Sequence, residues 1–261
     1  MTPAFVRGFR WSRSGIGAGR RAEASAPSEI RPPIGFRNDT GQAGGAASGS
    51  LVETGARPLG GAVKRIADIV IASVALAALL PLMAMIAAAI YLTMGRPIIF
   101  SHKRVGFAGR EFDCFKFRTM VKDSDQRLRE YLASNPDAAR IWRETRKLPN
   151  DPRVTPLGHF LRKSSLDELP QFLNILKGDM SCVGPRPVVR EELEKYGMSK
   201  RSYLAARPGL TGLWQVSGRS NTTYGMRVCL DRVYQRRWKL ILDCAIMLKT
   251  IPAVLKFRDT A

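Results

Sequence analysis

Residues 69–92 read IVIASVALAALLPLMAMIAAAIYL and contain no charged side chain. About 20 apolar residues are enough for a helix to cross the hydrocarbon core of a bilayer, so this stretch qualifies by its length. A buried core helix is the alternative, but this stretch is long and apolar on every side. The sequence therefore predicts a membrane segment within residues 61–95.

Two features of this segment argue against a simple span. Pro81 lies near its middle, where proline removes a backbone donor and favours a kink. Both flanks are basic, and cytoplasmic flanks carry the excess of Lys and Arg, so both ends are expected on the same side. We therefore expect a re-entrant helix-break-helix with its membrane break at Pro81. The basic flanking residues are Arg57, Lys64 and Arg65 before the stretch and Arg96, Lys103, Arg104 and Arg110 after it.

The segments on either side of the membrane segment differ in character. Residues 1–60 are rich in Gly, Ala, Ser, Arg and Pro, and they are expected to form a flexible basic leader. Residues 96–261 are expected to form a single membrane-attached domain of the α+β class, mainly helical. Its expected elements are a β-hairpin at 98–120 with a turn near 106–109, a helix pair at 122–148 interrupted at 135–136, a short helix at 165–178 and a C-terminal amphipathic helical segment at 228–257. The last segment suits a helix at the membrane interface or, equally, a helix packed on the core.

Composition narrows the classes of protein. The 261 residues carry a formal charge of +20, which predicts an anionic partner: nucleic acid, an acidic membrane surface or a phosphorylated substrate. The four cysteines form no CxxC pair, and there are two histidines. Neither a disulfide scaffold nor a multi-histidine metal site is therefore expected.

The densest polar cluster lies in residues 151–187, DPRVTPLGHFLRKSSLDELPQFLNILKGDMSCVGPRP. Its Ser-Leu-Asp-Glu run begins the predicted short helix. One interpretation is a capping box, in which Ser165 caps the helix and Glu168 reaches back to it. Pro170 would then lie deep in the helix, whereas a cap at Asp167 would place it in the first turn. Either way both carboxylates lie where the helix dipole keeps them ionised, as a nucleophile or metal ligand requires. Capping and catalysis are both open on this cluster alone.

Adjacent carboxylates narrow the chemistry. The carboxylates of glycosidases flank a bond from two sides, about 5–9.5 Å apart, and neighbours on one helical turn do so poorly. One carboxylate can instead attack phosphorus while the other holds Mg²⁺. The sequence has no Walker motif or kinase signature, which favours phosphoryl-type transfer without ATP binding. Cations nearby in the sequence suit a phosphate substrate. They are Lys116, Arg118, Arg153, Arg162, Arg186, Arg207 and Arg219.

From Lys64 to Arg258 the sequence resembles the bacterial sugar transferases of the monotopic phosphoglycosyl transferase superfamily. The matching stretches occur in order and extend over roughly three quarters of the chain. They are Lys64-Arg65-x-x-Asp68, Lys116-Phe117-Arg118-Thr119-Met120, Asp151-Pro152-Arg153-Val154-Thr155, Leu161-Arg162, Ser165-Leu166-Asp167-Glu168-Leu169-Pro170-Gln171, Gly178-Asp179-Met180-Ser181, Val183-Gly184-Pro185-Arg186-Pro187, Arg207-Pro208-Gly209-Leu210-Thr211-Gly212, Gln215-Val216 and Gly218-Arg219.

The resemblance implies a catalytic domain at residues 96–261 and a two-step reaction. Asp167 would attack the sugar-linked phosphate of a UDP-sugar and release UMP, and undecaprenyl phosphate would then take the sugar phosphate from the covalent aspartyl intermediate. Glu168 would bind the metal cofactor, Mg²⁺. The resemblance also implies a re-entrant helix broken at Pro81. The family commonly has Ser before this proline, whereas this chain has Leu80. The residues expected to bind the substrate are Lys116, Arg118, Arg162 and Arg186 at its phosphates and Gln215 and Arg219 at its nucleotide.

The resemblance is strongest to transferases that start exopolysaccharide synthesis. It favours galactose 1-phosphate as the transferred group, with UDP-glucose as the alternative donor. The expected location is the bacterial inner (cytoplasmic) membrane, with the catalytic domain facing the cytoplasm and downstream glycosyltransferases as further partners. A membrane-tethered nucleic-acid-binding protein is the more distant alternative. The charge permits it, but aromatic residues make up only 8% and no recognition motif is present, so no nucleic-acid partner is expected.

Overall fold

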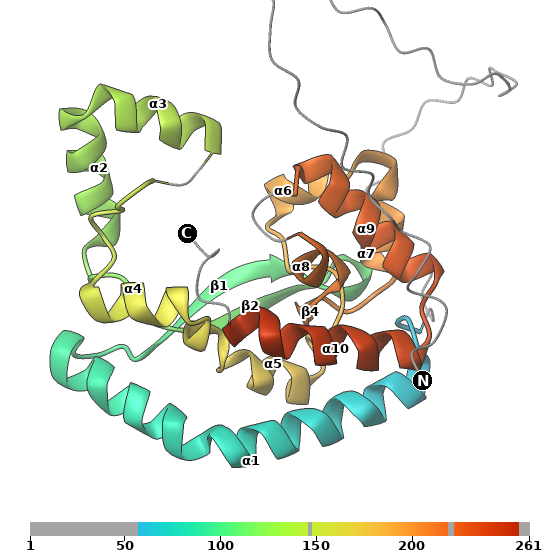
Figure 1. Cartoon of the computed structure of the whole chain (residues 1–261). Coiled ribbons are helices and arrows are strands. Elements are labelled where there is room, and N and C mark those ends of the chain that lie inside the picture. The colour runs from blue at the N-terminus through green and yellow to red at the C-terminus, as the bar shows by residue number, and fades with distance from the viewer. Residues whose placement is uncertain (1–56, 146–147, 219–221, 256–261) are drawn as a thin grey trace, which may run out of the picture. The chain divides into compact units, whose positions relative to one another are not determined.

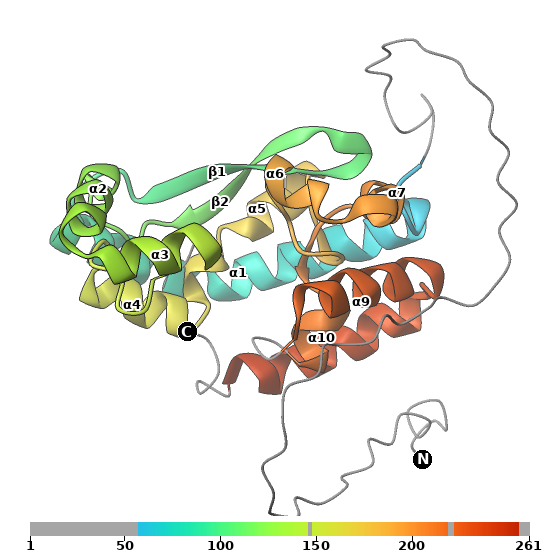
Figure 2. The same ribbon diagram turned by 90° about the horizontal axis from the view of Figure 1, so that it is seen from above.

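The computed structural model describes residues 57–145, 148–218 and 222–255. Residues 1–56 of the predicted leader lie outside these ranges. Helices make up 62% and strands 12% of these described residues, which confirms the expectation of a mainly helical α+β fold. Figures 1 and 2 show one long helix, α1, running alongside shorter helices and two small sheets.

Helix α1 (Gly61–Met94) is a continuous helix of 34 residues. Among the described residues it is the one helix long and apolar enough to cross a membrane, and 11% of its apolar stretch is buried. Pro81 lies inside it, so the prediction of two helices separated by a break is wrong. Proline removes the hydrogen bond to the carbonyl of Ala77, but the apolar residues on both sides continue the helix. Figure 1 shows that α1 bends in its middle part instead of breaking.

The predicted hairpin is confirmed. Strands β1 (Ile99–Val105) and β2 (Glu111–Phe117) pair antiparallel, with Ile99 opposite Phe117 and Val105 opposite Glu111. The 3-10 turn η2 (Phe107–Gly109) connects them at the predicted position.

The predicted helix pair is also confirmed, whereas the short helix that follows is divided. Helices α2 (Ser124–Ser134) and α3 (Pro136–Thr145) are separated at Asn135, and α4 (Pro156–Lys163) follows. In place of one helix at 165–178 there is a 3-10 turn, η3 (Leu166–Glu168), and then α5 (Gln171–Lys177). Pro170 lies at the junction, because it has no N–H to donate and is tolerated where a helix begins.

The C-terminal third contains a second small sheet and several helices. Strand β3 (Ser181–Val183) pairs in parallel with β4 (Gly209–Thr211). Helix α6 (Arg190–Glu194), the 3-10 turn η4 (Gly197–Ser199) and helix α7 (Lys200–Leu204) lie between them in the sequence, and α8 (Leu213–Ser217), α9 (Tyr224–Arg236) and α10 (Leu240–Leu255) follow β4. The predicted segment 228–257 is therefore two helices, because the chain leaves the helical path at residues 237–239.

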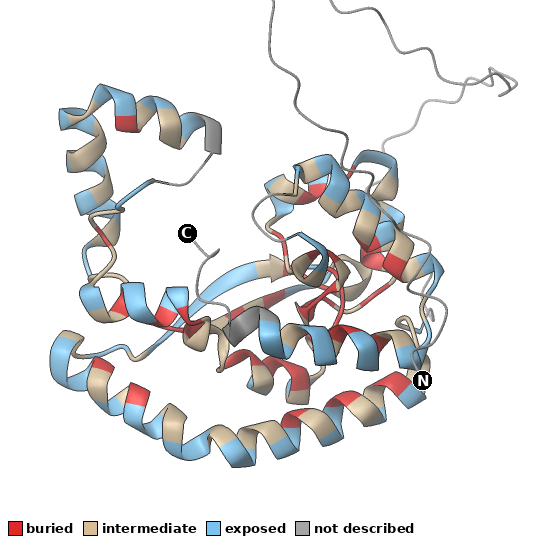
Figure 3. Ribbon diagram, viewed as in Figure 1, coloured by how far each residue is buried: buried red, intermediate tan, exposed pale blue. Residues whose placement is uncertain are grey.

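The main core cluster joins α1 with α5, α10 and the small sheets, through residues such as Ala72, Ile175 and Ile246. Helix α10 thus packs on the core, yet Ile241 and Leu248 remain 76% and 68% exposed on its outer side. Figure 3 shows few buried residues along α1 and mostly exposed or intermediate ones. The two helices together leave an apolar surface uncovered.

Polar side chains hold the start of α1 to the rest of the structure. Lys64 Nζ pairs with Asp243 Oδ2 of α10 at 2.5 Å, and the two side chains are 7% and 4% exposed. Arg65 donates to the carbonyl oxygens of Ile175 and Leu176 at the end of α5. Asp68 accepts hydrogen bonds from the hydroxyl of Ser181 and the backbone N–H of Cys182. The Lys64-Arg65-x-x-Asp68 run is therefore used for docking α1.

Arg118 holds the other end of α1. Its guanidinium donates to the carbonyl oxygens of Met94 and Gly95, which have no partner of their own in the helix. The start of the helix is thus bonded to α5, β3 and α10, and its end is bonded to Arg118, directly after β2.

We predict that Lys64→Met lowers the free energy of unfolding by about 3–5 kcal/mol, because it leaves Asp243 as a buried charge without its cation. The measurement is chemical or thermal unfolding of the full chain in detergent. Lys103→Met is the matched control: its pair with Asp113 is exposed (67% and 46%), and its loss should cost about 1 kcal/mol or less. Equal losses for the two variants would contradict the docking role of Lys64.

Candidate functional site

The two neighbouring carboxylates lie on the 3-10 turn η3, just before α5. Ser165, which precedes the turn, has a left-handed φ of 58°, and its side chain makes no capping hydrogen bond. The capping interpretation is therefore wrong. Asp167 is 7% exposed, and Glu168 pairs with a lysine instead of reaching back to Ser165. Neither carboxylate is used to cap a helix.

Lys116 of β2 connects the two carboxylates. Its Nζ lies 2.6 Å from Glu168 Oε1 and 3.6 Å from Asp167 Oδ2. Burial by itself would lower the pKa of Lys116, but the charges of Glu168 and Asp167 raise it above its ordinary value. Lys116 is thus held as a cation between them.

The buried side chain of Asn174 fixes this arrangement. It lies on α5, donates to the carbonyl oxygen of Asp113 and accepts from the N–H of Phe115, both on β2. Because these bonds lie next to Lys116 in the strand, they set the distance between Lys116 and the carboxylates that precede α5.

The environment makes the two carboxylates chemically different. Burial raises the pKa of Asp167, and the nearby Glu168 charge adds to this against the opposing Lys116 and Arg162. Burial would also raise the pKa of Glu168, but Lys116 and Arg186 outweigh it and hold that pKa below its ordinary value. Glu168 is therefore the ionised partner of the cations, and Asp167 is the more basic carboxylate. Neighbouring acids whose pKa values are moved in opposite directions by their environment are typical of functional sites.

Two predicted phosphate-binding arginines face the pair. Arg162 of α4 donates through Nε to the hydroxyl of Thr119 at 2.9 Å, and its charge acts on Asp167. Arg186 lies exposed in the loop after β3, with its guanidinium 5.9 Å from the ring centre of Trp214. This loop needs Gly184, because a Cβ there would come within 2.4 Å of the carbonyl oxygen of Arg207.

The other predicted binding residues are placed differently. Arg118 is buried, and its guanidinium donates to the end of α1 through Nη2, whereas its Nε and Nη1 have no hydrogen-bond partner among the described residues. Gln215 of α8 donates to the carbonyl oxygen of Leu210, and its buried Oε1 has no partner in the described part of the chain. Arg219 lies outside the described residues.

Arg104 is a cation of the site that sequence reasoning did not select. It is half-buried on β1, and its charge helps to lower the pKa of Glu168. Burial and the charge of Arg186 lower the pKa of Arg104 itself. The alternation of side chains along the predicted strands could have identified Arg104, because in the hairpin register Arg104 and Lys116 lie on the same face.

The donor set fits a magnesium ion that is shared with a substrate. Mg²⁺ is usually bound by one or two carboxylates together with phosphate oxygens and waters. Asp167 and Glu168 supply such oxygens, but the described residues contain no group of three or more Asp, Glu, His or Cys side chains that could hold a metal ion by themselves. Glu168 is the candidate ligand, and Lys116 would have to share or leave its Oε1.

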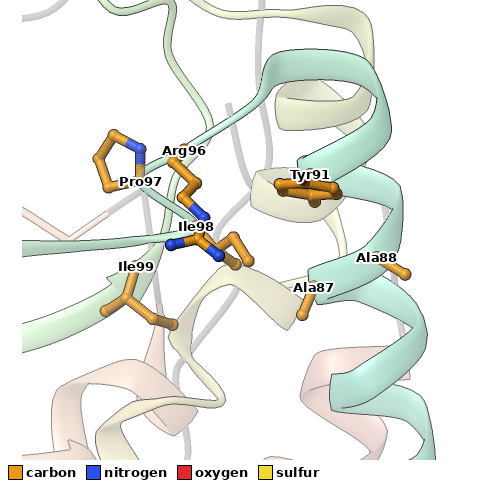
Figure 4. A pocket seen from close by; sticks show the side chains of 7 residues that line it. All are labelled: Ala87, Ala88, Tyr91, Arg96, Pro97, Ile98 and Ile99. Carbon is orange, nitrogen blue, oxygen red and sulfur yellow. The ribbon is translucent and has the colours of Figure 1, made fainter.

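A separate hollow of about 620 Å³ lies beside the C-terminal end of α1. Figure 4 shows Ala87, Ala88 and Tyr91 of α1 on one side and Arg96 to Ile99 on the other. Its lining is mainly apolar and includes neither Asp167 nor Glu168, so the hollow does not form the carboxylate site.

Comparisons with known proteins agree on one family. The family model of bacterial sugar transferases matches residues 59–257. The exopolysaccharide production protein ExoY of Rhizobium meliloti is 53% identical over 209 residues, which are 80% of this chain and 92% of that protein. The undecaprenyl-phosphate galactose phosphotransferase of Salmonella typhimurium is 53% identical over 167 residues, 64% of this chain and 35% of that protein. The UDP-glucose:undecaprenyl-phosphate glucose-1-phosphate transferase of Caulobacter vibrioides is 39% identical over 200 residues, 74% of this chain and 69% of that protein.

Proposed function

The chain belongs to the bacterial sugar transferase family, and we propose that it transfers a hexose 1-phosphate from a UDP-sugar to undecaprenyl phosphate and releases UMP. The observation that carries this proposal is the buried Asp167 beside Glu168 with Lys116 between them. The names of the Salmonella and Caulobacter relatives support the substrate classes.

In the first step, a carboxylate oxygen of Asp167 attacks the sugar-linked phosphorus of the UDP-sugar. A phosphorus–oxygen bond to Asp167 forms, the bond from that phosphorus to the bridging oxygen breaks, and UMP leaves with this oxygen and its electron pair. In the second step, a phosphate oxygen of undecaprenyl phosphate attacks the same phosphorus, and the carboxylate of Asp167 is released. Two displacements at one carboxylate divide a difficult transfer into two easier ones.

The surrounding side chains lower the cost of bringing two anions together. Lys116 lies 3.6 Å from Asp167, and the charge of Arg162 also acts on Asp167; both cations would balance the charge of the diphosphate that approaches it. A Mg²⁺ ion held by Glu168 would neutralise further charge on the phosphate oxygens when bound. Arg118 acts indirectly in this scheme, because its bonds to Met94 and Gly95 position the end of α1.

Galactose is the sugar that we propose. Its support is the Salmonella relative, named as a galactose phosphotransferase and 53% identical, compared with 39% for the relative named as a glucose-1-phosphate transferase. UDP-glucose is the alternative donor for the same reaction, and both are included in the test below.

The attachment of α1 at both ends supports a position of the whole domain on one side of the membrane, and the basic flanks of α1 favour the cytoplasmic side of the bacterial inner membrane. At about 1.5 Å per residue, 34 residues make a helix about 50 Å long, more than the roughly 30 Å hydrocarbon core. Lys64 near one end is nevertheless bonded to Asp243 of α10, and Met94 at the other end is bonded to Arg118, directly after β2. We propose that α1 dips into one leaflet along its exposed apolar side and that both ends stay in the cytoplasm.

The test of the reaction is incubation of membranes containing the full chain with undecaprenyl phosphate and radiolabelled UDP-galactose or UDP-glucose, with and without EDTA. We expect label in the lipid fraction, release of UMP and loss of both on adding EDTA. Release of UDP instead would mean that the other bond is broken, and the mechanism would fail.

We predict that Asp167→Asn abolishes turnover and the covalent adduct, because the amide cannot attack phosphorus. Intact-mass spectrometry of protein incubated with the UDP-sugar alone should show a hexose-phosphate increment in the original chain and none in the variant. Asp113→Asn is the control, since this β2 carboxylate is half exposed and paired with Lys103. Substantial turnover by Asp167→Asn would rule out its role as nucleophile.

For Glu168→Gln we predict a rate at least tenfold lower and a weaker dependence on magnesium, because a neutral amide is a poorer ligand for a hard cation. The rate is measured as a function of Mg²⁺ concentration. An unchanged response to Mg²⁺ would remove Glu168 from the metal site.

For the membrane topology we predict that cysteines introduced at Arg57 and Ser101 react with an impermeant maleimide only after the cells are lysed. The exposed Cys229 and Cys244 are first replaced by Ser, so that they do not contribute label. Labelling of one introduced cysteine in intact spheroplasts would show that α1 spans the membrane.

A further inference from the structure

Arg104 and Lys116 lie on the same face of the β1–β2 hairpin. Arg104 is opposite Phe112, and Lys116 follows Phe112 by four residues along β2. Side chains alternate along a strand, so residues 112, 114 and 116 share a face with the partner of residue 112. At about 3.3 Å per residue, Arg104 lies roughly 13 Å along the hairpin from Lys116, and two long cationic side chains can converge on a ligand between them.

The side chain of Arg104 makes no bond that would hold the described part of the fold together. It is half-buried, but it makes no hydrogen bond or ion pair within residues 57–145, 148–218 and 222–255. Arg186 likewise has no carboxylate partner there, and its guanidinium lies over Trp214. Burial and the charge of Arg186 lower the pKa of Arg104, although the charge of Glu192 opposes this. Two neighbouring guanidinium groups that form no ion pair among the described residues make a site suited to a phosphate.

The backbones that carry these two arginines are fixed to each other. The N–H of Val105 donates to the carbonyl oxygen of Val188 at 2.9 Å. The buried hydroxyl of Tyr203 donates to the carbonyl oxygen of Val105 at 2.7 Å and accepts from the N–H of Val188 at 3.2 Å. Arg104 directly precedes Val105, and Arg186 precedes Val188 by two residues, so these bonds fix the backbone on which both arginines lie. Tyr203 is therefore a positioning residue.

The position along the hairpin indicates which phosphate the pair meets. The end near Lys116 exposes apolar Ile99 and Phe100 and joins α1, whereas the far end carries the exposed ion pair of Glu111 and Arg190. A lipid phosphate arrives from the apolar side, and a nucleotide arrives from water. Arg186 also lies over Trp214, the neighbour of Gln215.

We propose that Arg104, together with Arg186, forms the subsite for the nucleoside-linked phosphate, the group that leaves as UMP. This inference rests on the proposed function for the identity of the nucleotide. When the bridging bond breaks, negative charge collects on this phosphate, and a guanidinium fork stabilises it. The lipid phosphate does not use this pair.

The test is calorimetric titration of UMP and of uridine into the full chain in detergent. Arg104→Ala should weaken UMP binding at least tenfold and leave uridine binding unchanged, and Arg104→Lys should fall between. Lys103→Ala, the neighbouring cation on the opposite face, should bind UMP as the original chain does. Equal UMP affinity in Arg104→Ala and the original chain would overturn the inference, as would failure of the original chain to bind UMP.

Turnover gives a second readout. Arg104→Ala should raise KM for the UDP-sugar at least tenfold and change KM for undecaprenyl phosphate less than twofold. A raised KM for the lipid with an unchanged affinity for UMP would assign Arg104 to the lipid phosphate and overturn the inference. UMP binding that depends on Arg104 without any lipid-linked product would instead leave the subsite intact and refute the proposed function. Thermal unfolding of each variant checks that the fold is retained.

Discussion

Two adjacent carboxylates, one of them nearly buried, cannot both be ionised cheaply unless a cation lies between them. Lys116 is that cation, and much of the surrounding structure serves to keep it there. The hairpin provides a rigid strand for it, and Asn174 ties that strand to α5 next to the carboxylates. The same cation separates the properties of the two acids. Glu168 is held ionised, and Asp167 becomes the more basic of the two. This difference suits the roles that we propose, Asp167 as the nucleophile and Glu168 as the metal ligand.

The second constraint is the attachment of α1. A helix with so large an exposed apolar surface is expected to seek lipid, but polar contacts at both of its ends bind it to the domain that carries the carboxylates. Arg118 links the two features directly, since it lies two residues after Lys116 in the chain and holds the end of α1. The distance between the apolar surface of α1 and the carboxylates is therefore set by protein contacts. This suits a reaction in which one substrate is dissolved in water and the other in the membrane.

Two groups of cations can be distinguished among the described residues once the contacts are known. Arg65, Arg118 and Arg207 donate to backbone carbonyl oxygens, and Arg153 pairs with Asp151 at 2.6 Å. These arginines stabilise the fold. Lys116, Arg104, Arg162 and Arg186 instead direct their charge at the carboxylates or at each other. Net charge alone pointed to an anionic partner, but it gave no means of separating the two groups.

Local patterns were sufficient for several features. The uncharged run of residues 69–92, the hairpin at 98–120 and the interruption at Asn135 depend on neighbours in the sequence, and the structure has each of them. The Asp-Glu pair and its family were also identified from the sequence, because the motifs follow one another in order. Tertiary structure decided what depends on distant partners. Pro81 bends a helix that continues, Ser165 caps nothing, and Arg118 binds α1. Arg104 joins Lys116 only through the strand register. The physical reason is that the partners of a charged side chain are often distant in the sequence and come close only when the chain folds, so local sequence patterns do not identify them.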